Sequence, residues 1–373
     1  IQGADLGGLF LISFSVVLIY ALLFWFMSKI HASFSSSSSS SDYHFRYPVT
    51  VFLLLSCLGG YSVIRYRQVS LKTATADTAY LAAVQGNIEQ SRKWSPSQKE
   101  SIVDRYLALS TQALKGEKKP ELLVWPETAL PFYPAREPLM NSIRAFIREN
   151  EVRILTGSPY FTVNPQKTSY ETQVSYYNSA LLLDSSGRLS ARYNKQHLVP
   201  FGEYIPLRKY LWFLKPIVEL IGEFTPGDSF DPLDAENIQA GILICFEAIF
   251  PDIARREALA GANLLVNLTN DAWYGKSSAP HHSWAMTVFR AVENRRGLIR
   301  AANTGISGFV DPTGDIGRKS DLFTAEVSSM RMPLLEDPTI FMRGGYRFST
   351  LCLLLIPIFL YLSMRKQRNK TKI

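Results

Sequence analysis

Cysteine is scarce in this sequence, and its distribution excludes a disulfide in the polar part of the chain. Only 3 cysteines occur among 373 residues. Cys57 and Cys352 lie inside long apolar runs, where a cysteine is usually a small hydrophobic side chain. Cys245 is the only cysteine of the polar region between those runs, so it has no local partner for a disulfide. A free thiol in that region requires another explanation.

The sequence also lacks the patterns by which many proteins bind metals and phosphates. His281 and His282 are adjacent rather than at metal-ligand spacing, and no cysteine or acidic cluster joins them. No glycine-rich phosphate loop is present. We therefore expect the protein to use neither a metal ion nor any other cofactor.

Charged residues are absent from three long apolar runs, at residues 6–27, 48–64 and 348–364. A helix that crosses a bilayer needs about 20 apolar residues, with a range of roughly 17–25. The two shorter runs are flanked by Arg, Lys or Tyr, as is typical of helix ends at a membrane interface. We therefore predict three membrane-spanning helices, with a buried core helix as the alternative for the two shorter runs. The first run is too long for a signal peptide, and no basic segment precedes it.

The last residues of the chain, 365–373, are strongly basic. They read RKQRNKTKI and hold five basic residues and no acidic one, against a net charge of +8 for the whole chain. Most of the excess positive charge therefore lies beside the third apolar run, and no nucleic-acid partner is needed to explain it. Because positively charged flanks stay in the cytoplasm, we expect the tail there and the region between the second and third runs on the opposite side.

The composition divides the chain into three parts. Residues 1–72 contain the first two apolar runs, joined by a serine-rich connector at residues 33–44. Residues 75–333 have the pattern of a globular α/β domain, and residues 334–373 contain the third run and the basic tail. In the middle part, short β-rich runs alternate with helical patterns, and several of these runs are almost entirely apolar. This alternation indicates a sheet that is covered on at least one face.

Turns, helices and strands can be placed within the middle part. The segments DSSGR and DPTGD, at residues 184–188 and 311–315, predict hairpin turns in which glycine supplies a positive φ. Helical patterns occupy residues 97–115, 138–150 and 281–297. The β-rich runs are TAYLAAVQ, ELLVWPE, VRILTGSPY, YNSALLLD, GILICFE, ANLLVNLTN and GISGFVDP.

Three chemically useful side chains follow strands of this pattern. Glu127 follows ELLVWP, Lys195 follows the return strand of a hairpin, and Cys245 ends GILIC. Ligands gather at the carboxyl ends of strands in layered α/β folds, so the three groups could converge. A thiol nucleophile needs a base that makes it a thiolate, and a cation or N–H donors where the oxyanion develops. Taken singly, each residue has a simpler explanation, as a solvated carboxylate, a surface lysine or a core cysteine.

The motifs around these residues resemble those of the nitrilase superfamily and, within it, of the apolipoprotein N-acyltransferase family. The order Glu, Lys, Cys is similar, with WPE, YNK and CFE around the three residues. Further similar stretches are ADLGG, VQGNIEQSRKW, PFGEYIPL, ICFEAIFPD and NLTNDAWYGKSSAPHHSW. The resemblance implies an α/β fold, a nitrilase-like four-layer αββα sandwich flanked by transmembrane helices. Family members have more membrane helices than the three predicted here, so we expect further helices ahead of Ile1.

The resemblance also implies a role for each matching residue. Cys245 is implied as the nucleophile, Glu127 as the general base and Lys195 as the cation that stabilises the tetrahedral intermediate. Other matching positions are implied to bind substrate or support the site: Trp94, Glu203, Phe246 and Glu247. The family often has tyrosine where this chain has Phe246, so no role that needs a phenolic hydroxyl is implied here.

The implied reaction is a two-step acyl transfer at the bacterial inner membrane, with the catalytic domain facing the periplasm. Cys245 takes an acyl chain from a phospholipid as a thioester. The α-amino group of an apolipoprotein's N-terminal S-diacylglyceryl-cysteine then receives that chain. Because a thioester must be kept from water, we expect residues 207–224, as a membrane-dipping arm, and residues 271–284 to cover the site; the second segment could equally pack on the core. The protein is expected to be a monomer.

Two other hypotheses remain open from the sequence alone. The first keeps the fold but makes the protein a membrane-anchored nitrilase-like amidase, which hydrolyses a C–N bond with water as the acceptor. The apolar runs and the apolar arm argue against it. The second is a membrane-anchored binding module with a decayed active site, and the presence of Glu127, Lys195 and Cys245 together argues against that.

Overall fold

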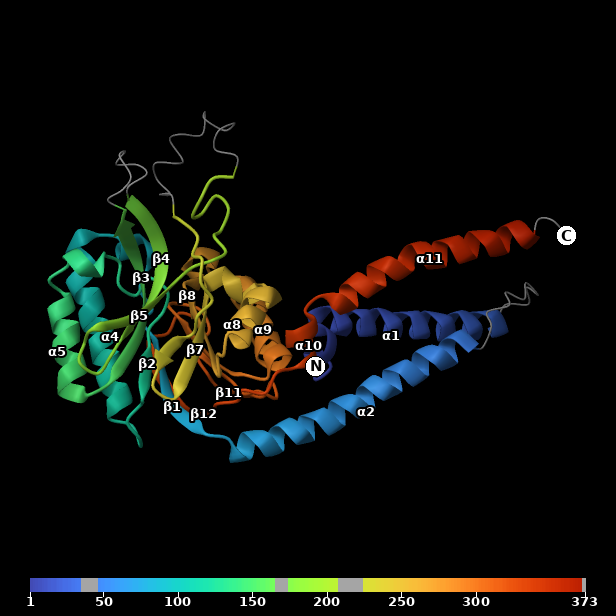
Figure 1. The fold of residues 1–373 in the computed structure, drawn as a ribbon, viewed down its shortest axis with the longest axis horizontal. Coiled ribbons are helices and arrows are strands. Elements are labelled where there is room, and N and C mark those ends of the chain that lie inside the picture. The colour runs from blue at the N-terminus through green and yellow to red at the C-terminus, as the bar shows by residue number, and fades with distance from the viewer. Residues whose placement is uncertain (35–45, 165–173, 207–223, 371–373) are drawn as a thin grey trace.

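The computed structural model describes residues 1–34, 46–164, 174–206 and 224–370. Most of the predicted serine-rich connector, residues 207–223 of the predicted arm and the end of the basic tail lie outside these ranges. The described part consists of a layered α/β domain from which three long helices project on one side (Figure 1).

The three projecting helices are α1 (Ala4–Phe34), α2 (Arg46–Thr75) and α11 (Arg347–Lys370). Each contains a stretch that is long and apolar enough to cross a membrane. No more than 6% of any of these stretches is buried within the protein. The alternative of a buried core helix is therefore wrong for the two shorter runs, because their apolar side chains lack the protein neighbours of a core.

Two six-stranded sheets form the centre of the α/β domain (Figure 1). In each sheet three neighbouring strands are parallel, and the strands that flank them are antiparallel. The first sheet runs in the order β12 (Glu326–Pro333), β1 (Thr78–Gln85), β2 (Leu122–Val124), β3 (Arg153–Val163), β4 (Val174–Leu183), β5 (Leu189–Asn194). The second runs in the order β11 (Ile316–Lys319), β10 (Gly308–Val310), β9 (Gly297–Ala302), β8 (Leu264–Thr269), β7 (Ile238–Ile244), β6 (Leu233–Ala235).

Three hydrophobic clusters hold the layers together. One lies between the two sheets and includes Leu81 from the first and Ile242 from the second. Another joins the outer face of the first sheet to α4 (Lys99–Leu114) and α5 (Met140–Asn150). The last joins the outer face of the second sheet to α8 (Pro251–Leu259) and α9 (Ala279–Asn294), so the order of layers is helix, sheet, sheet, helix. The predicted αββα sandwich is confirmed.

Both predicted hairpin turns join antiparallel strands, at residues 184–188 between β4 and β5 and at 311–315 between β10 and β11. The helix predicted at 281–297 is too long, because α9 ends at Asn294 and Gly297 already begins β9. Every residue of β9 is buried, so its pattern does not alternate and was not distinguished from a helix. The remaining short elements are α3 (Gln90–Lys93), α10 (Ile340–Gly344) and the 3-10 turns η1 (Pro96–Gln98), η2 (Pro134–Arg136), η4 (Cys245–Ile249) and η5 (Asp271–Tyr274).

Candidate active site

Cys245 lies at a sharp turn between a strand and a helix. β7 ends at Ile244, and Cys245 opens η4 with a φ of 54°, a left-handed conformation that residues other than glycine rarely adopt. Helix α8 then begins at Pro251. A turn of this kind presents its side chain at the carboxyl edge of the sheet instead of within the strand. Cys245 is accordingly half-buried, whereas Ile244 is buried.

Glu127 follows β2 in a segment that is fixed by packing. Trp125 is buried, stacks on Tyr106 with ring centroids 5.1 Å apart, and donates its indole N–H to Ser110 at 2.9 Å. Gly157 on β3 allows the chain to come close, because a Cβ there would lie 2.5 Å from the Cα of Glu127. The Glu127 residue is 8% exposed. Its position is therefore determined by the core beneath it, not by solvent.

Lys195 follows β5 and directs its ammonium group at two carboxylates. Its Nζ lies 2.9 Å from Glu203 and 3.9 Å from Oε1 of Glu127. Asn178, on β4, donates through Nδ2 to Oε1 of both glutamates at 2.8 Å. The side chain of Lys195 is 1% exposed. The simpler explanation of a surface lysine is therefore wrong, since Lys195 is a buried cation between two anions.

The charges of this cluster act on the Cys245 thiol. Burial raises the pKa of Cys245 to about 12; the negative charge of Glu127 adds to this rise and the positive charge of Lys195 opposes it. Burial alone would lower the pKa of Lys195, but the charges of Glu127, Cys245 and Glu203 raise it above its usual value. The resting thiol is therefore protonated at neutral pH, beside a carboxylate that can accept its proton and a lysine that keeps its charge.

Glu247 connects the loop of Lys195 to the turn of Cys245. Its carboxylate is fully buried and accepts hydrogen bonds from three backbone N–H groups, those of Gln196 at 2.6 Å, His197 at 3.0 Å and Ile244 at 2.6 Å. Burial raises the pKa of Glu247 to about 7, and these backbone donors act in the opposite direction. Because the donors directly follow Lys195 and directly precede Cys245, Glu247 holds the two residues in register.

Replacing Glu247 with glutamine is expected to loosen this connection. The amide would place an NH2 group where the carboxylate now accepts from the N–H of Ile244, so two donors would face each other. An unsatisfied buried donor costs about 1–3 kcal/mol. We expect a lower thermal-unfolding midpoint and a turnover of the folded enzyme reduced roughly 10–100-fold, since about 1.4 kcal/mol corresponds to tenfold.

Glu257→Gln is the matched control for this change. Glu257 is also a buried carboxylate and accepts from the backbone N–H of Ile242 at 3.3 Å, but none of its hydrogen bonds reaches the Lys195 loop. We expect this variant to lose stability and keep its turnover. Equal losses of turnover in both variants, measured on folded protein, would show that Glu247 has no special role in positioning.

Two residues at the site were not anticipated from the sequence. Asn178 binds both glutamates, yet in the sequence it is one polar residue within a β-rich run. Lys93 is 2% exposed and donates through Nζ to the main-chain oxygen of Glu127 at 3.0 Å. Burial lowers the pKa of Lys93 to about 8, against the opposing charges of Glu127 and Cys245. The only sequence signal for Lys93 is that it directly precedes Trp94.

Two cavities adjoin the cluster. The smaller, of about 120 Å³, is lined by charged, aromatic and amide side chains that include Lys93, Trp94, Glu127, Asn178, Glu203 and Trp273. The larger, of about 510 Å³, is mainly apolar, and its lining includes Leu9, Cys245, Phe246, Ile249, Tyr274 and Met286. Its volume falls within the roughly 300–1,000 Å³ that is typical of ligand sites. The thiol therefore faces an apolar cavity, one wall of which belongs to the membrane helix α1.

The other predicted site residues lie around these cavities. Trp94 is 54% exposed at the smaller cavity, and Phe246 packs edge-on against Phe250 with ring centroids 5.5 Å apart. The predicted cover at residues 271–284 borders both cavities, whereas residues 207–223 lie outside the described part. Within the described ranges, no group of three or more His, Cys, Asp or Glu side chains could hold a metal ion. The expectation that no cofactor is used stays a prediction.

The sequence matches one family profile and curated relatives that share a name. The family profile described as carbon-nitrogen hydrolase matches residues 80–335. A protein of Geobacter metallireducens named apolipoprotein N-acyltransferase is 39% identical over 369 residues, which cover 98% of this chain and 68% of that protein. A protein of the same name from Brucella melitensis is 37% identical over 260 residues, covering 68% of this chain and 48% of the relative. The chain thus spans about half to two thirds of the length of these curated relatives.

Solved structures share the fold of the α/β domain. Nit3 of Saccharomyces cerevisiae, a member of branch 10 of the nitrilase superfamily, gives a TM-score of 0.52 at 18% identity and covers 69% of this chain and 90% of its own. The NitFhit protein of C. elegans gives a TM-score of 0.53 at 20% identity, with 74% of this chain and 65% of that one covered. At such low identity, the similarity establishes the fold alone.

Proposed function

This chain belongs to the carbon–nitrogen hydrolase family and, within it, to the apolipoprotein N-acyltransferases, and from that membership we propose that it transfers an acyl chain from a phospholipid to a lipoprotein. The acceptor is the α-amino group of an N-terminal S-diacylglyceryl-cysteine. The observation that carries the proposal is the mainly apolar cavity at Cys245, because Leu9 in its wall belongs to a helix that is long and apolar enough to span a membrane. Such a cavity suits a lipid chain, whereas a water-soluble amide does not need an apolar cavity of this kind.

In the first step Cys245 attacks the carbonyl carbon of a phospholipid ester. Glu127 accepts the thiol proton as the S–C bond forms, and the ammonium group of Lys195 stabilises the negative charge that develops on the carbonyl oxygen. The ester C–O bond then breaks, and the departing oxygen takes the proton from Glu127. A lysophospholipid leaves, and the acyl chain stays on Cys245 as a thioester.

In the second step the neutral α-amine of the lipoprotein attacks the thioester. As the N–C bond forms, Glu127 accepts one proton from the nitrogen, and Lys195 again stabilises the oxyanion. The C–S bond breaks, the sulfur takes the proton from Glu127, and an amide is released. Over the two steps the enzyme neither gains nor loses a proton, so the site returns to its resting state.

The protein is a bacterial membrane protein, and the proposal places it in the inner membrane as a monomer with its α/β domain in the periplasm. Two features support this orientation. The basic tail follows the third apolar helix and favours the cytoplasm for that end, which leaves the domain on the other side. A site in the periplasm would also meet exported lipoproteins, whose acceptor amine is available there.

Intact-protein mass spectrometry tests the proposal directly. The protein is incubated in vesicles of a palmitoyl phospholipid, and we expect an added mass of one palmitoyl group on Cys245 together with release of lysophospholipid. A peptide with an N-terminal S-diacylglyceryl-cysteine should then remove the adduct and become N-acylated. The same peptide with an acetylated amine is the control and should leave the adduct in place.

The amidase alternative gives a different outcome in the same experiment. An amidase would release ammonia or an amine from small amides and would form no adduct with the phospholipid. Hydrolysis of amides without any acyl adduct on Cys245 would therefore contradict the proposal.

A further inference from the structure

The first membrane helix is broken near its start. Gly8 has a φ of 67° and a ψ of −166°, which lie outside the helical region. A Cβ at Gly8 would lie 2.6 Å from the ring of Phe341, so both the conformation and the space require glycine. The break leaves the N–H of Leu9 without a partner in the helix, and it donates instead to Oε1 of Glu293, on α9, at 2.8 Å.

A buried polar chain runs from Glu293 to the turn that carries the nucleophile. Oε2 of Glu293 lies 2.9 Å from Nε of Arg290, and both side chains are 0% exposed. Nη1 of Arg290 donates to the main-chain oxygen of Ile249 at 3.0 Å. Ile249 ends η4, the turn that begins with Cys245. Three successive contacts thus connect the break in the membrane helix with the cysteine turn.

Stability alone does not explain the pair of Arg290 and Glu293. Removing two charges from water has a large desolvation cost, and apolar residues of similar volume often stabilise a core as well as a buried ion pair or better. The pair does supply directional contacts at both of its ends, to α1 and to η4. An apolar pair could not make these directional contacts, so we assign the ion pair a role in positioning.

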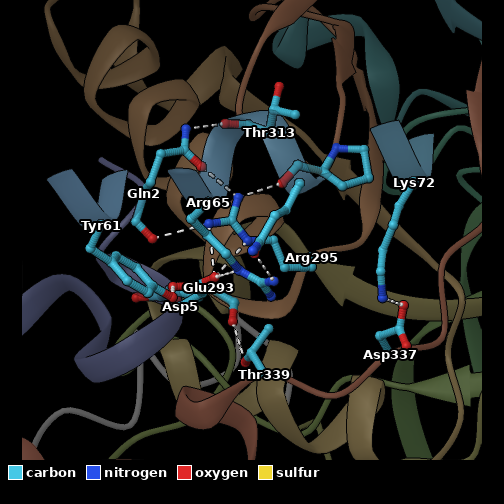
Figure 2. A network of polar contacts seen from close by, with 12 residues as sticks. Gln2, Asp5, Tyr61, Arg65, Lys72, Glu293, Arg295, Thr313, Asp337 and Thr339 are labelled. Atoms are coloured by element: carbon cyan, nitrogen blue, oxygen red, sulfur yellow. Dashed lines mark hydrogen bonds and ion pairs between the residues drawn. The ribbon is translucent and has the colours of Figure 1, made fainter. Parts of the chain in front are cut away.

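A second buried network fixes the start of α1 to the α/β domain (Figure 2). Asp5 lies 2.9 Å from Arg295, just after α9, and 2.7 Å from Arg65 on α2, and it accepts from the hydroxyl of Tyr61 at 2.7 Å. Arg295 also donates to the side-chain oxygen of Gln2 at 2.6 Å. The segment that ends at Gly8 is therefore held on the domain, and the helix beyond it starts from a fixed point.

We propose that Leu9 is a specificity-determining residue in the wall of the Cys245 cavity, and that Glu293 is the positioning residue that holds it there. Leu9 lines this cavity together with Met286 and His282 of α9, the helix that also carries Glu293. The ligand is an unbranched alkyl chain that reaches the thiol between α1 and α9. The inference rests on the proposed function only in identifying this alkyl chain as the acyl chain of the donor.

Alkylation of Cys245 tests the cavity wall independently of acyl transfer. In a background of Cys57→Ser and Cys352→Ser, the thiol is reacted with iodoacetamide and with a long N-alkyl iodoacetamide, and the ratio of the two rates is measured by mass spectrometry. We expect Leu9→Trp to lower the long-to-short ratio about tenfold, the scale at which hydrophobic pockets discriminate between chains. Leu9→Ala should raise the relative rate of a branched N-alkyl reagent, because it widens the same wall.

Val17→Trp is the matched control on the same helix. Val17 is 62% exposed and lies outside the cavity, so we expect its ratio to equal that of the parent protein. A Leu9→Trp ratio that equals the Val17→Trp ratio would overturn the proposal, and so would an unchanged branched-chain rate in Leu9→Ala. Both results are independent of whether a phospholipid adduct forms, so failure of this inference and failure of the proposed function are distinguishable.

Glu293 variants test the positioning role. Glu293→Gln keeps an oxygen that can accept from Leu9, whereas Glu293→Leu keeps the volume and loses the acceptor. We expect the glutamine variant to keep the parent long-to-short ratio and the leucine variant to lose part of it. The ratio cancels any change in the reactivity of Cys245 itself, because both reagents would share that change. Equal ratios in the two variants would assign Glu293 a merely structural role.

Discussion

Replacing Cys245 with serine is expected to abolish thioester formation and to lower turnover by about four orders of magnitude or more, as for other nucleophiles that act as one unit with their base. A hydroxyl is far less acidic than a thiol, and this position disfavours an anion strongly. Burial and the charge of Glu127 already raise the pKa of the thiol to about 12. A base that can deprotonate the thiol during attack is therefore inadequate for the hydroxyl. Release of lysophospholipid and intact-protein mass are the two measurements.

The other two cysteines provide controls for this variant. Cys57→Ser and Cys352→Ser alter thiols on α2 and α11, outside both cavities, and we expect each to keep turnover and the acyl adduct. Cys245→Ser should also keep the unfolding midpoint, because serine tolerates the left-handed φ of 54° about as well as cysteine does. A palmitoyl adduct that persists in Cys245→Ser and moves to another residue would disprove the assignment of the nucleophile.

The layers of the fold could be predicted because the apolar pattern of a strand indicates which of its faces are buried. The run ANLLVNLTN contains β8, whose six residues are all buried, as expected for a strand covered on both faces. The strand β9 was missed for a related reason: it is equally buried, but it carries Arg300, and it directly follows a helix that shares its apolar character. Arg300 is compatible with burial because it pairs with Asp271 at 2.8 Å and also donates to the side-chain oxygen of Asn267 and the main-chain oxygen of Ile306, contacts that no local pattern reveals.

The candidate site shows the same difference between what local sequence predicts and what distant contacts determine. Glu127, Lys195 and Cys245 could be proposed from the sequence, because each follows a strand and the order of the three matches a known family. The surroundings of these residues could not be predicted from the sequence, since they depend on contacts between distant segments. Asn178 contacts both glutamates from β4, a strand that lies between β3 and β5 in one sheet. Leu9 borders the cavity from the position that follows the break of α1 at Gly8.

Replacing Glu127 with glutamine is expected to slow acyl transfer by about 10²–10⁴-fold, the usual contribution of a general base. The side chain keeps its size, and an amide oxygen can still accept from Asn178, so we expect the fold to persist. In the proposed reaction, this variant cannot accept the thiol proton in the first step or the amine proton in the second. Turnover and the rate of adduct formation should therefore fall together.

The same variant should make the resting thiol easier to ionise, which separates a missing base from a damaged site. The negative charge of Glu127 raises the pKa of Cys245, so its removal should lower that pKa and increase the thiolate fraction at any given alkaline pH. Lys195→Met should do the opposite, because the charge of Lys195 lowers this pKa, and its loss of an oxyanion partner should slow transfer by about 10²–10³-fold. Titration of the thiolate by ultraviolet difference absorbance, in the background without Cys57 and Cys352, measures both shifts. If the two variants moved the titration in the same direction, the opposed charges assigned to Glu127 and Lys195 would not be acting on the sulfur, and slow transfer in either variant would have to come from a change in structure.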